Sequence, residues 1–309
     1  MTEISVVASR PHYRWHLDPI MEALGLPFAV TPPRSVRGLS IVASGGDAAN
    51  LPSRAPYVYV EHGAGQTYGG NPHSGYAGSR KHRNVKAFIC PSERVAEIWR
   101  ATYPNVPAVA VGCPFLDPWH LGERPIPVDR TVTITFHWRC KVSSFANWAF
   151  PHYRAELHHV VDAWRRQGWQ VLGHAHPKER AALRKFWDSI GVEFVENIAE
   201  VYDRSHVLVA DNSSVLPEFM SLGRPVIMMD APWYDRSVSI GGRFWDWDKA
   251  GYVVGGPRDL TRINLDWLTL ADPFATERKA VVEATYAYSD GHASARAAEV
   301  IHRVLKEMT

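Results

Sequence analysis

The segment from Ser205 to Asp230 constrains the fold more than any other stretch of this 309-residue chain. Its apolar run, residues 207–210, has the length of a strand, and four small polar residues, 211–214, end that run in a turn. Apolar residues at helical spacing follow as far as Gly223, and a second apolar run begins after Pro225. The segment therefore predicts a strand, a capped turn, a helix and a second strand, the unit from which parallel α/β sheets are built.

The turn in this segment is a candidate binding site. A helix that begins at Ser213 and Ser214 presents unpaired backbone N–H groups, two hydroxyls and a positive dipole end beyond the carboxyl end of the strand. A phosphate fits such a site. An ordinary helix cap on a buried unit has the same local pattern, so the turn alone leaves both interpretations open.

The alternation of strand-length runs and helical patterns extends over residues 4–111 and again over residues 131–229. A Pro-rich stretch, residues 123–130, separates the two series. We expect an α/β protein with two Rossmann-like parallel-sheet domains, residues 1–126 and residues 127–309, the second closed by a C-terminal helix. Ligands of such folds bind at the carboxyl ends of the strands, and we expect them in a cleft between the domains.

The composition excludes several classes of protein. A formal charge of +2 lacks the basic excess of a dedicated nucleic-acid-binding protein. Three cysteines, Cys90, Cys113 and Cys140, form no CxxC pair, which argues against a disulfide framework or a structural zinc site and fits a reducing compartment. We find no signal peptide and no apolar run near the roughly 20 residues that cross a bilayer. We therefore expect a soluble, cytoplasmic protein.

Polar loops follow four of the expected strands, where ligands bind to parallel sheets. Glycines in the first loop, among them Gly63 and Gly65, permit tight turns and a close approach of the backbone to a ligand. The four loops read EHGAGQTY (61–68), FHWRCK (136–141), GHAHPK (173–178) and ADNSSVLPE (210–218).

Six short motifs occur in one order along the chain. They are His62-Gly63; Gly112-Cys113-Pro114-Phe115-Leu116-Asp117; Phe136-His137-Trp138-Arg139; His176-Pro177; the block from Asp211 to Ser214 with Glu218 and Gly223-Arg224-Pro225-Val226; and Asp290-Gly291 with Ala293 and Arg296. In this order they resemble the CDP-glycerol glycerophosphotransferase-like group of GT-B transferases, which is similar to the nucleotide-sugar 2-epimerases and related glycosyltransferases. The resemblance covers most of the chain and implies a GT-B fold and a nucleotide-diphosphate donor.

The resemblance also implies roles for individual residues. His62 is the candidate general base, since the attacking hydroxyl must lose a proton and imidazole titrates near neutral pH; the alternative is a loop histidine with a structural hydrogen bond. Arg139 and His176 are expected at the donor diphosphate. Ser213 and Ser214 are expected to hold a phosphate. Glu218 is expected at a ribose hydroxyl, with a solvated helix carboxylate as the alternative.

The other residues singled out have structural interpretations. Gly112 and Asp211 are expected at a turn or a cleft wall, and His174 is expected to be structural. Asp246-Trp247-Asp248 matches a DxD metal motif, but it lies in a Gly- and Trp-rich loop instead of following a strand, so we expect no metal ligand there. The basic segment SRKHRNVK, residues 79–86, fits an acceptor-docking loop, although a solvated turn explains it more simply.

These observations favour a metal-independent GT-B glycosyltransferase with no cofactor beyond a nucleotide-activated donor, acting on a hydroxyl of a protein, a glycan or a nucleic acid. The glycerophosphotransferases follow the His-Gly pair with a Thr-Pro and a lysine, whereas this chain has Ala64-Gly65-Gln66-Thr67-Tyr68. That departure disfavours glycerol phosphate but leaves CDP-glycerol-type transfer as an alternative. A nucleotide-sugar 2-epimerase, which needs carboxylates for proton abstraction, and a non-catalytic binding module are the further alternatives.

Overall fold

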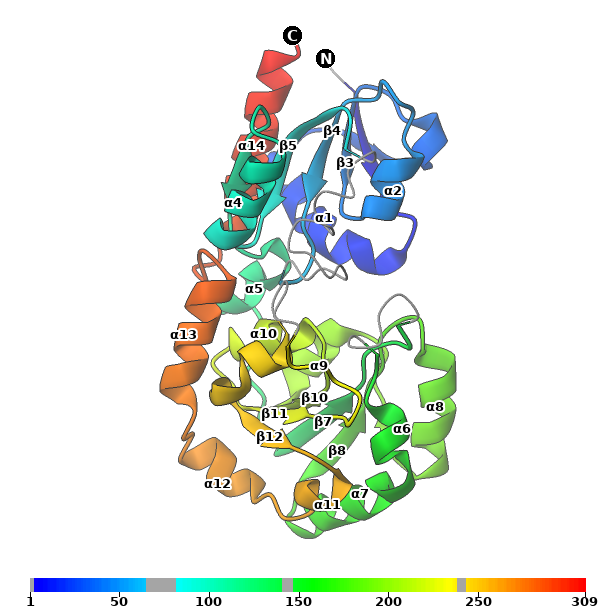
Figure 1. The fold of residues 1–309 in the computed structure, drawn as a ribbon, viewed down its shortest axis with the longest axis vertical. Helices are drawn as coiled ribbons and strands as arrows, with labels where there is room; N and C mark the ends of the chain where they lie inside the picture. Colours follow the sequence, from blue (N-terminus) through cyan, green and yellow to red (C-terminus); the bar gives the residue numbers. More distant parts are fainter. Residues whose placement is uncertain (1–2, 65–81, 141–146, 238–242) are drawn as a thin grey trace. The chain divides into compact units, whose positions relative to one another are not determined.

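The computed structural model describes residues 3–64, 82–140, 147–237 and 243–309. The chain divides into two compact units: unit 1 comprises Met1–Glu123 and Glu283–Thr309, and unit 2 comprises Arg124–Val282. Each unit contains one six-stranded sheet whose strand pairs are all parallel (Figure 1). The α/β class and the two parallel sheets predicted from the alternating pattern are confirmed.

The sheet of unit 1 has the strand order β2-β1-β3-β4-β5-β6, so β3 and β4 lie at its centre. Its strands are β1 (Ile4–Val7), β2 (Phe28–Val30), β3 (Leu39–Val42), β4 (Tyr57–Val60), β5 (Val85–Cys90) and β6 (Ala108–Ala110). The described helices of unit 1 are α1 (Pro11–Leu24), η1 (Pro33–Ser35), α2 (Gly45–Asn50), α4 (Glu93–Thr102), η2 (Pro114–Leu116), α5 (Asp117–His120) and α14 (Ala293–Glu307).

Strand β4 shows how the side chains of unit 1 divide between two hydrophobic clusters. Val58 and Val60 pack with buried residues of α1 and α14. Tyr57 and Tyr59 pack with buried residues of α4. Because successive side chains of a strand point to opposite faces, this alternation fixes which face of the sheet each helix covers. A one-residue shift in register would reverse both faces.

Unit 2 has the strand order β12-β11-β10-β7-β8-β9. Its strands are β7 (Thr131–Thr135), β8 (Gln170–Gly173), β9 (Glu193–Phe194), β10 (Val207–Ala210), β11 (Val226–Met229) and β12 (Tyr252–Val254). Its described helices are α6 (Phe150–Tyr153), η4 (Arg154–Glu156), α7 (Leu157–Arg166), α8 (Arg180–Ser189), α9 (Ile198–Arg204), α10 (Val215–Met220), η5 (Phe244–Asp246), η6 (Asp248–Ala250), α11 (Pro257–Leu260) and α12 (Leu265–Leu270), and α13 (Ala275–Thr285) runs across the boundary between the units. The strand-turn-helix-strand segment predicted around residues 205–230 is present as β10, α10 and β11.

The C-terminal helix belongs to unit 1, which corrects the expectation that the second domain extends to residue 309. In α14, Ala297, Val300, Ile301 and Val304 are buried in the same cluster as the strands β1 and β3 and helix α1. The apolar periodicity of this segment predicts an amphipathic helix but does not identify the sheet that the helix covers. That choice depends on contacts between the two ends of the chain.

Two motifs, joined by a hydrogen bond between residues 176 apart in sequence, form one structural joint inside unit 1. The Asp117 carboxylate accepts hydrogen bonds from the backbone N–H groups of Ala293, at 3.0 Å, and Ser294, at 2.7 Å, and so caps the first turn of α14. Gly112 has a φ of +97°, and a Cβ there would lie 2.8 Å from the carbonyl oxygen of Tyr288. A bidentate ion pair between Asp290 and Arg296 completes the joint.

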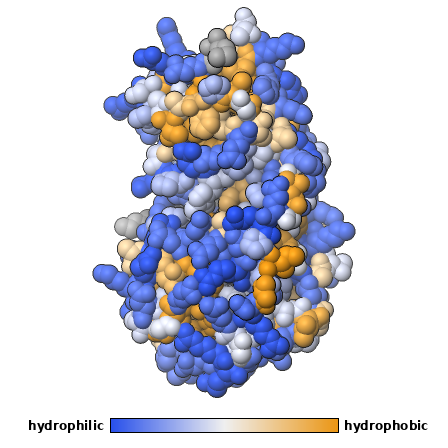
Figure 2. All heavy atoms as spheres, turned by 180° about the vertical axis from the view of Figure 1, so that it is seen from behind, coloured by the Kyte–Doolittle hydropathy of each residue, from blue (hydrophilic) through white to orange (hydrophobic). Residues whose placement is uncertain are grey.

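The surface of the chain is largely hydrophilic, with hydrophobic side chains gathered in separate patches on the face that Figure 2 shows. In the described part of the chain, no helix has the length and apolar character needed to span a membrane. The exposed large hydrophobic residues come from several elements and loops: Phe28, Val30, Leu121, Ile126, Val128, Trp233, Tyr252, Trp267, Leu270 and Tyr288.

We predict that Asp117→Ala destabilises unit 1 by about 1–3 kcal/mol, because it removes a helix cap and leaves two buried N–H groups without an acceptor. Urea unfolding monitored by tryptophan fluorescence measures the effect. Glu22→Ala is the control, since Glu22 is exposed on α1 in the same unit. Equal unfolding midpoints for the two variants would contradict the role of Asp117.

Candidate functional site

The loop after β4 carries the candidate base of unit 1. The backbone N–H of Glu61 bonds the carbonyl of Ile89, and the Glu61 carboxylate accepts from Trp99 Nε1 at 3.0 Å. Burial raises the pKa of Glu61 to about 7. Gly63 has a φ of +63°, so the chain turns sharply directly after His62. Gly65, which we also expected in this turn, lies outside the described residues.

His62 is exposed to solvent, but its ring lies among other rings of unit 1. The ring centroids of Tyr13 and His16 lie 5.3 and 6.0 Å from that of His62. Desolvation by the surrounding groups lowers the pKa of His62, and the ring donates a hydrogen bond to the backbone carbonyl of Ala43. A neutral imidazole whose proton is held by a carbonyl has an acceptor lone pair on its other nitrogen. The lowered pKa and the hydrogen bond to Ala43 both fit a proton acceptor at this position.

His16 lies beside His62, but its side chain is buried and is therefore a poorer candidate for the base. Its side chain is buried in α1, and burial, with further contributions from His62 and His12, lowers the pKa of His16 to about 3. His16 therefore stays neutral at physiological pH. A neutral neighbour adds no positive charge beside His62, which preserves the basicity of the exposed ring.

In unit 2, the loops that follow β7 and β8 meet at one edge of the sheet. Their backbones are joined, since the His174 N–H bonds the carbonyl of Ile134 and the His176 N–H bonds that of Phe136. The His176 and His137 ring centroids lie 5.6 Å apart. His176 Nδ1 accepts from the Lys178 backbone N–H at 3.2 Å, so Nε2 carries the proton of the neutral ring and is a donor.

Trp138 and Lys178 border this group of histidines. The Lys178 ammonium lies over the Trp138 ring, 3.5 Å from its centroid, and the His176 ring centroid lies 6.2 Å from that of Trp138. The strand edge of unit 2 thus gathers an ammonium group, two imidazoles and an indole. Such a group attracts an anion and offers a flat apolar surface beside it.

Arg139 is held by a partner that the sequence did not reveal. The nearly buried Glu179 carboxylate accepts from the backbone N–H of Arg139 at 3.2 Å and from its Nε at 3.0 and 3.1 Å, and an ion pair of 3.0 Å joins Arg139 Nη2 to Glu179 Oε2. These hydrogen bonds and the charge of Glu179 raise the pKa of Arg139. Glu179 therefore orients the Arg139 guanidinium and ties the loop after β7 to the loop after β8. The one feature of the sequence that could have pointed to Glu179 is its position three residues after His176, in a loop that already carried a candidate residue.

Asp211 anchors the loop after β7 to the end of β10. The fully buried carboxylate accepts from the backbone N–H groups of His137, at 2.7 Å, and Ala149, at 2.8 Å. Burial raises the pKa of Asp211 to about 7, although these two hydrogen bonds favour the charged form. Asp211 thus ties His137 and Ala149 to the end of β10.

The candidate phosphate turn lies at the start of α10. Ser213 is buried and its N–H bonds the Asp211 carbonyl at 2.7 Å, while Ser214 is the N-cap residue and its side chain makes no capping bond. Glu218 is 5% exposed and accepts from the Tyr202 hydroxyl at 2.7 Å. The alternative of a solvated helix carboxylate is therefore wrong, because α10 turns Glu218 inward; the ribose contact stays a prediction.

Three further residues lie apart from these contacts. His174 is buried, its Nδ1 lies 2.7 Å from Thr135 Oγ1, and burial lowers the pKa of His174 to about 3, which agrees with a structural role. The Asp246 carboxylate accepts from the Arg243 N–H at 2.8 Å, and Asp248 lies 3.8 Å from Arg236. Within the described ranges, no group of three or more His, Cys, Asp or Glu residues is placed to hold a metal ion.

Comparison with known proteins gives one family and one fold. A family model described as CDP-Glycerol:Poly(glycerophosphate) glycerophosphotransferase matches residues 64–303. No protein with a curated description matches the chain significantly in sequence. The solved structure of the wall teichoic acid polymerase TagF matches with a TM-score of 0.71 and 15% identity, over 99% of this chain and 90% of that chain. A variant of TagF soaked with CDPG matches with a TM-score of 0.70 and 15% identity, over 99% of this chain and 89% of that chain.

Two further solved structures share the fold at lower TM-scores. The UDP-GlcNAc 2-epimerase from Neisseria meningitidis, bound to UDP-GlcNAc, matches with a TM-score of 0.56 and 13% identity over 99% of this chain and 100% of that chain. The MnaA-UDP structure from S. aureus matches with a TM-score of 0.59 and 12% identity, over 99% of this chain and 97% of that chain. The GT-B fold expected from the sequence motifs is confirmed.

We predict that Glu218→Gln is more stable than the parent chain by about 1–3 kcal/mol at pH 8 and equally stable near pH 4.5. Burial raises the pKa of Glu218 to about 7, so the folded state binds the proton more tightly than the unfolded state, and parent stability falls as pH rises from about 4.5 to 7. Glutamine keeps an acceptor for Tyr202 without a charge. Urea unfolding at several pH values measures the difference, and Glu277→Gln, on an exposed position, is the control. A pH-independent difference would contradict the prediction.

Proposed function

Because the chain belongs to the CDP-glycerol:poly(glycerophosphate) glycerophosphotransferase family, we propose that it transfers a glycerophosphoryl group from a CDP-glycerol-like donor to a hydroxyl-bearing acceptor. Membership makes the chain a nucleotide-donor transferase with a GT-B fold. The observation that carries the finer assignment is the family match itself, which spans residues 64–303 and therefore parts of both units. It favours glycerophosphoryl transfer over the glycosyl transfer that we first expected.

The proposed reaction is a substitution at phosphorus. An acceptor hydroxyl oxygen attacks the phosphorus that carries the glycerol, a new P–O bond forms, and the bond from that phosphorus to the oxygen bridging the two phosphates breaks. CMP leaves with the bridging oxygen, and the hydroxyl proton passes to a base. The protein must therefore accept one proton and stabilise negative charge on the leaving phosphate.

Unit 1 supplies the base in this proposal. One ring nitrogen of His62 donates to the Ala43 carbonyl, and in the neutral ring the other nitrogen is an acceptor. Desolvation lowers the pKa of His62, which favours the neutral form that a base requires. The half-buried Glu61 carboxyl is a poorer candidate, since it is engaged by Trp99.

Unit 2 supplies the donor contacts. Arg139, oriented by Glu179, and the Nε2–H of His176 present donors to the diphosphate, and Ser213 and Ser214 offer hydroxyls at the adjacent strand end. Trp138 offers a flat surface for a base. We propose that these groups replace a divalent cation and that the reaction needs no cofactor. The three buried free cysteines fit a reducing compartment, which we propose is the cytoplasm.

Epimerisation of a nucleotide sugar is the second candidate, because two of the fold relatives are structures with UDP or UDP-GlcNAc. Glu61, with a pKa near 7, is a carboxyl group next to His62. Its hydrogen bond to Trp99 turns it toward the interior of unit 1, so we rank this function second. Incubation with UDP-GlcNAc and no acceptor separates the candidates, since an epimerase then forms an isomer without releasing nucleotide.

We predict that the chain releases CMP from CDP-glycerol only when a poly(glycerophosphate) or other polyol acceptor is present, and that EDTA leaves the rate within about twofold, because fixed cationic and hydrogen-bonding groups supply the positive potential. Chromatography of the nucleotides measures the release, and UDP-GlcNAc serves as the control donor. Loss of activity in EDTA that Mg²⁺ or Mn²⁺ restores would overturn the metal-independent mechanism.

We predict that His62→Ala lowers turnover by about 10²- to 10⁴-fold with donor affinity nearly unchanged, the usual effect of removing a positioned base. His176→Ala should weaken donor binding as well as turnover, because its contact exists before and during the reaction. Calorimetry with CDP-glycerol and single-turnover rates measure both effects. His158→Ala, on an exposed position of α7, is the control. If His62→Ala abolishes donor binding while bound donor still reacts at the parent rate, His62 is not the base.

A further inference from the structure

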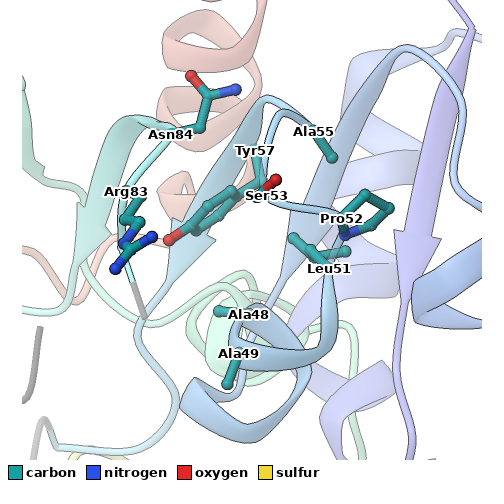
Figure 3. Close-up of a pocket in the computed structure, with 9 residues that line it drawn as sticks. All are labelled: Ala48, Ala49, Leu51, Pro52, Ser53, Ala55, Tyr57, Arg83 and Asn84. Carbon is teal, nitrogen blue, oxygen red and sulfur yellow. The ribbon is translucent and has the colours of Figure 1, made fainter. Parts of the chain in front are cut away.

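Unit 1 has a pocket away from His62. Its volume is about 320 Å³, at the lower end of the range of roughly 300–1,000 Å³ for small-molecule sites. The end of α2, the loop after it and the starts of β4 and β5 form its walls (Figure 3). The lining residues are Ala48, Ala49, Leu51, Pro52, Ser53, Ala55, Tyr57, Arg83 and Asn84.

Among the described lining residues, Arg83 is the only one with a charged side chain and none is acidic, so their net charge is positive. Figure 3 shows the Arg83 guanidinium and the Tyr57 hydroxyl on the same side of the pocket. Within the described part of the chain, no hydrogen bond or ion pair engages the side chain of Arg83 or of Ser53. A guanidinium without an internal partner, next to a hydroxyl, is suited to a phosphate.

The walls around Arg83 are fixed in place. The Tyr57 hydroxyl lies 3.0 Å from Nδ1 of the buried His82, and the Tyr57 N–H bonds the Asn84 carbonyl. Asn84 Nδ2 donates to the Arg54 carbonyl at 2.6 Å, which ties the loop after α2 to the start of β5. A ligand therefore meets a pocket that is formed before binding, which reduces the ordering cost of association.

We propose that this pocket binds an organic phosphate with a short aliphatic body, the phosphate on Arg83 and the carbon chain on Tyr57, Leu51 and Pro52. The proposal rests on the proposed function in one respect: a poly(glycerophosphate) acceptor repeats this chemistry along its length. The occupant is then either an internal repeat of that acceptor or a free glycerol phosphate. Residues 79–81 of the basic segment 79–86 lie outside the described residues, and the proposal concerns only Arg83 of that segment.

The separation between the pocket and His62 determines which acceptors can occupy both places. Tyr57 begins β4 and His62 follows its carboxyl end, so the two lie on the order of 15 Å apart at about 3.3 Å per residue. A single glycerol phosphate cannot reach both places. An acceptor of several repeats can present its terminal hydroxyl to His62 while an earlier phosphate occupies the pocket. The pocket then favours long acceptors over short ones through a second attachment.

The test uses the full chain and three variants. Arg83→Gln removes the guanidinium, and Ala49→Leu, at an exposed position of α2, fills the pocket while keeping Arg83. Arg54→Gln is the matched control, because it removes the same charge from the neighbouring loop without touching the lining. Calorimetry with a poly(glycerophosphate) oligomer and with glycerol 3-phosphate measures binding, and transfer rates on oligomers of increasing length measure the kinetic effect.

We expect Arg83→Gln and Ala49→Leu to weaken oligomer binding by about tenfold, the effect of one charge-assisted hydrogen bond, and Arg54→Gln to change it less than twofold. KM for long acceptors should rise with kcat unchanged, and KM for the shortest acceptor should not move. Equal effects of Arg83→Gln and Arg54→Gln, or parent-like binding by Arg83→Gln, overturn the pocket.

The binding and transfer measurements test the pocket and the proposed function separately, so one proposal can be overturned while the other stands. Oligomer binding that depends on Arg83, in a chain that transfers nothing from CDP-glycerol, supports the pocket and overturns the proposed function. Transfer whose dependence on acceptor length is the same in Arg83→Gln as in the parent overturns the pocket and leaves the function intact. Glycerol 3-phosphate that binds as tightly as the oligomer, with the same dependence on Arg83, supports the pocket and identifies the free compound as its occupant.

Discussion

The parallel pairing of β10 with β7, and of β7 with β8, determines where the candidate donor-binding side chains of unit 2 lie. Parallel strands end at the same edge of a sheet, so the loops that follow them meet although they are 30 to 80 residues apart in sequence. Arg139, His176 and Ser213 each follow one of these strands. Their proximity is a property of the sheet and requires no other fold-specific contact.

Two buried carboxylates show how this architecture is held together. Asp117 accepts from two backbone N–H groups at the start of α14, and Asp211 accepts from two in the loop after β7. Each carboxylate supplies acceptors to backbone N–H groups that have no partner within a helix or a strand. In both cases the carboxylate serves backbone partners, so an acidic residue in a short motif can be explained by the loop that it holds.

Helices and strands could be predicted from the sequence better than the partners that their side chains contact. The apolar runs around residues 205–230 gave β10 and β11 because the pattern of a buried parallel strand is local. The pairing of Glu179 with Arg139 was not visible, because it joins residues 40 apart through two different strands. The place of α14 was missed for the same reason. The placement of His62 and His176 directly after strands could be predicted because their spacing from a strand end is local, whereas their roles stay predictions. The burial of Glu218 could not be decided from the sequence, because it depends on the hydroxyl of Tyr202 against which α10 packs it.

Unit 1 is assembled from both ends of the chain, with unit 2 inserted between them. During synthesis the ribosome delivers the six strands of unit 1 and then all of unit 2 before it delivers α14, whose side chains complete the core around β1 and β3. Until then, the face of the sheet that α14 covers stays exposed. Unit 2 can finish folding first, so the part of the chain that is made first is the last to become fully structured.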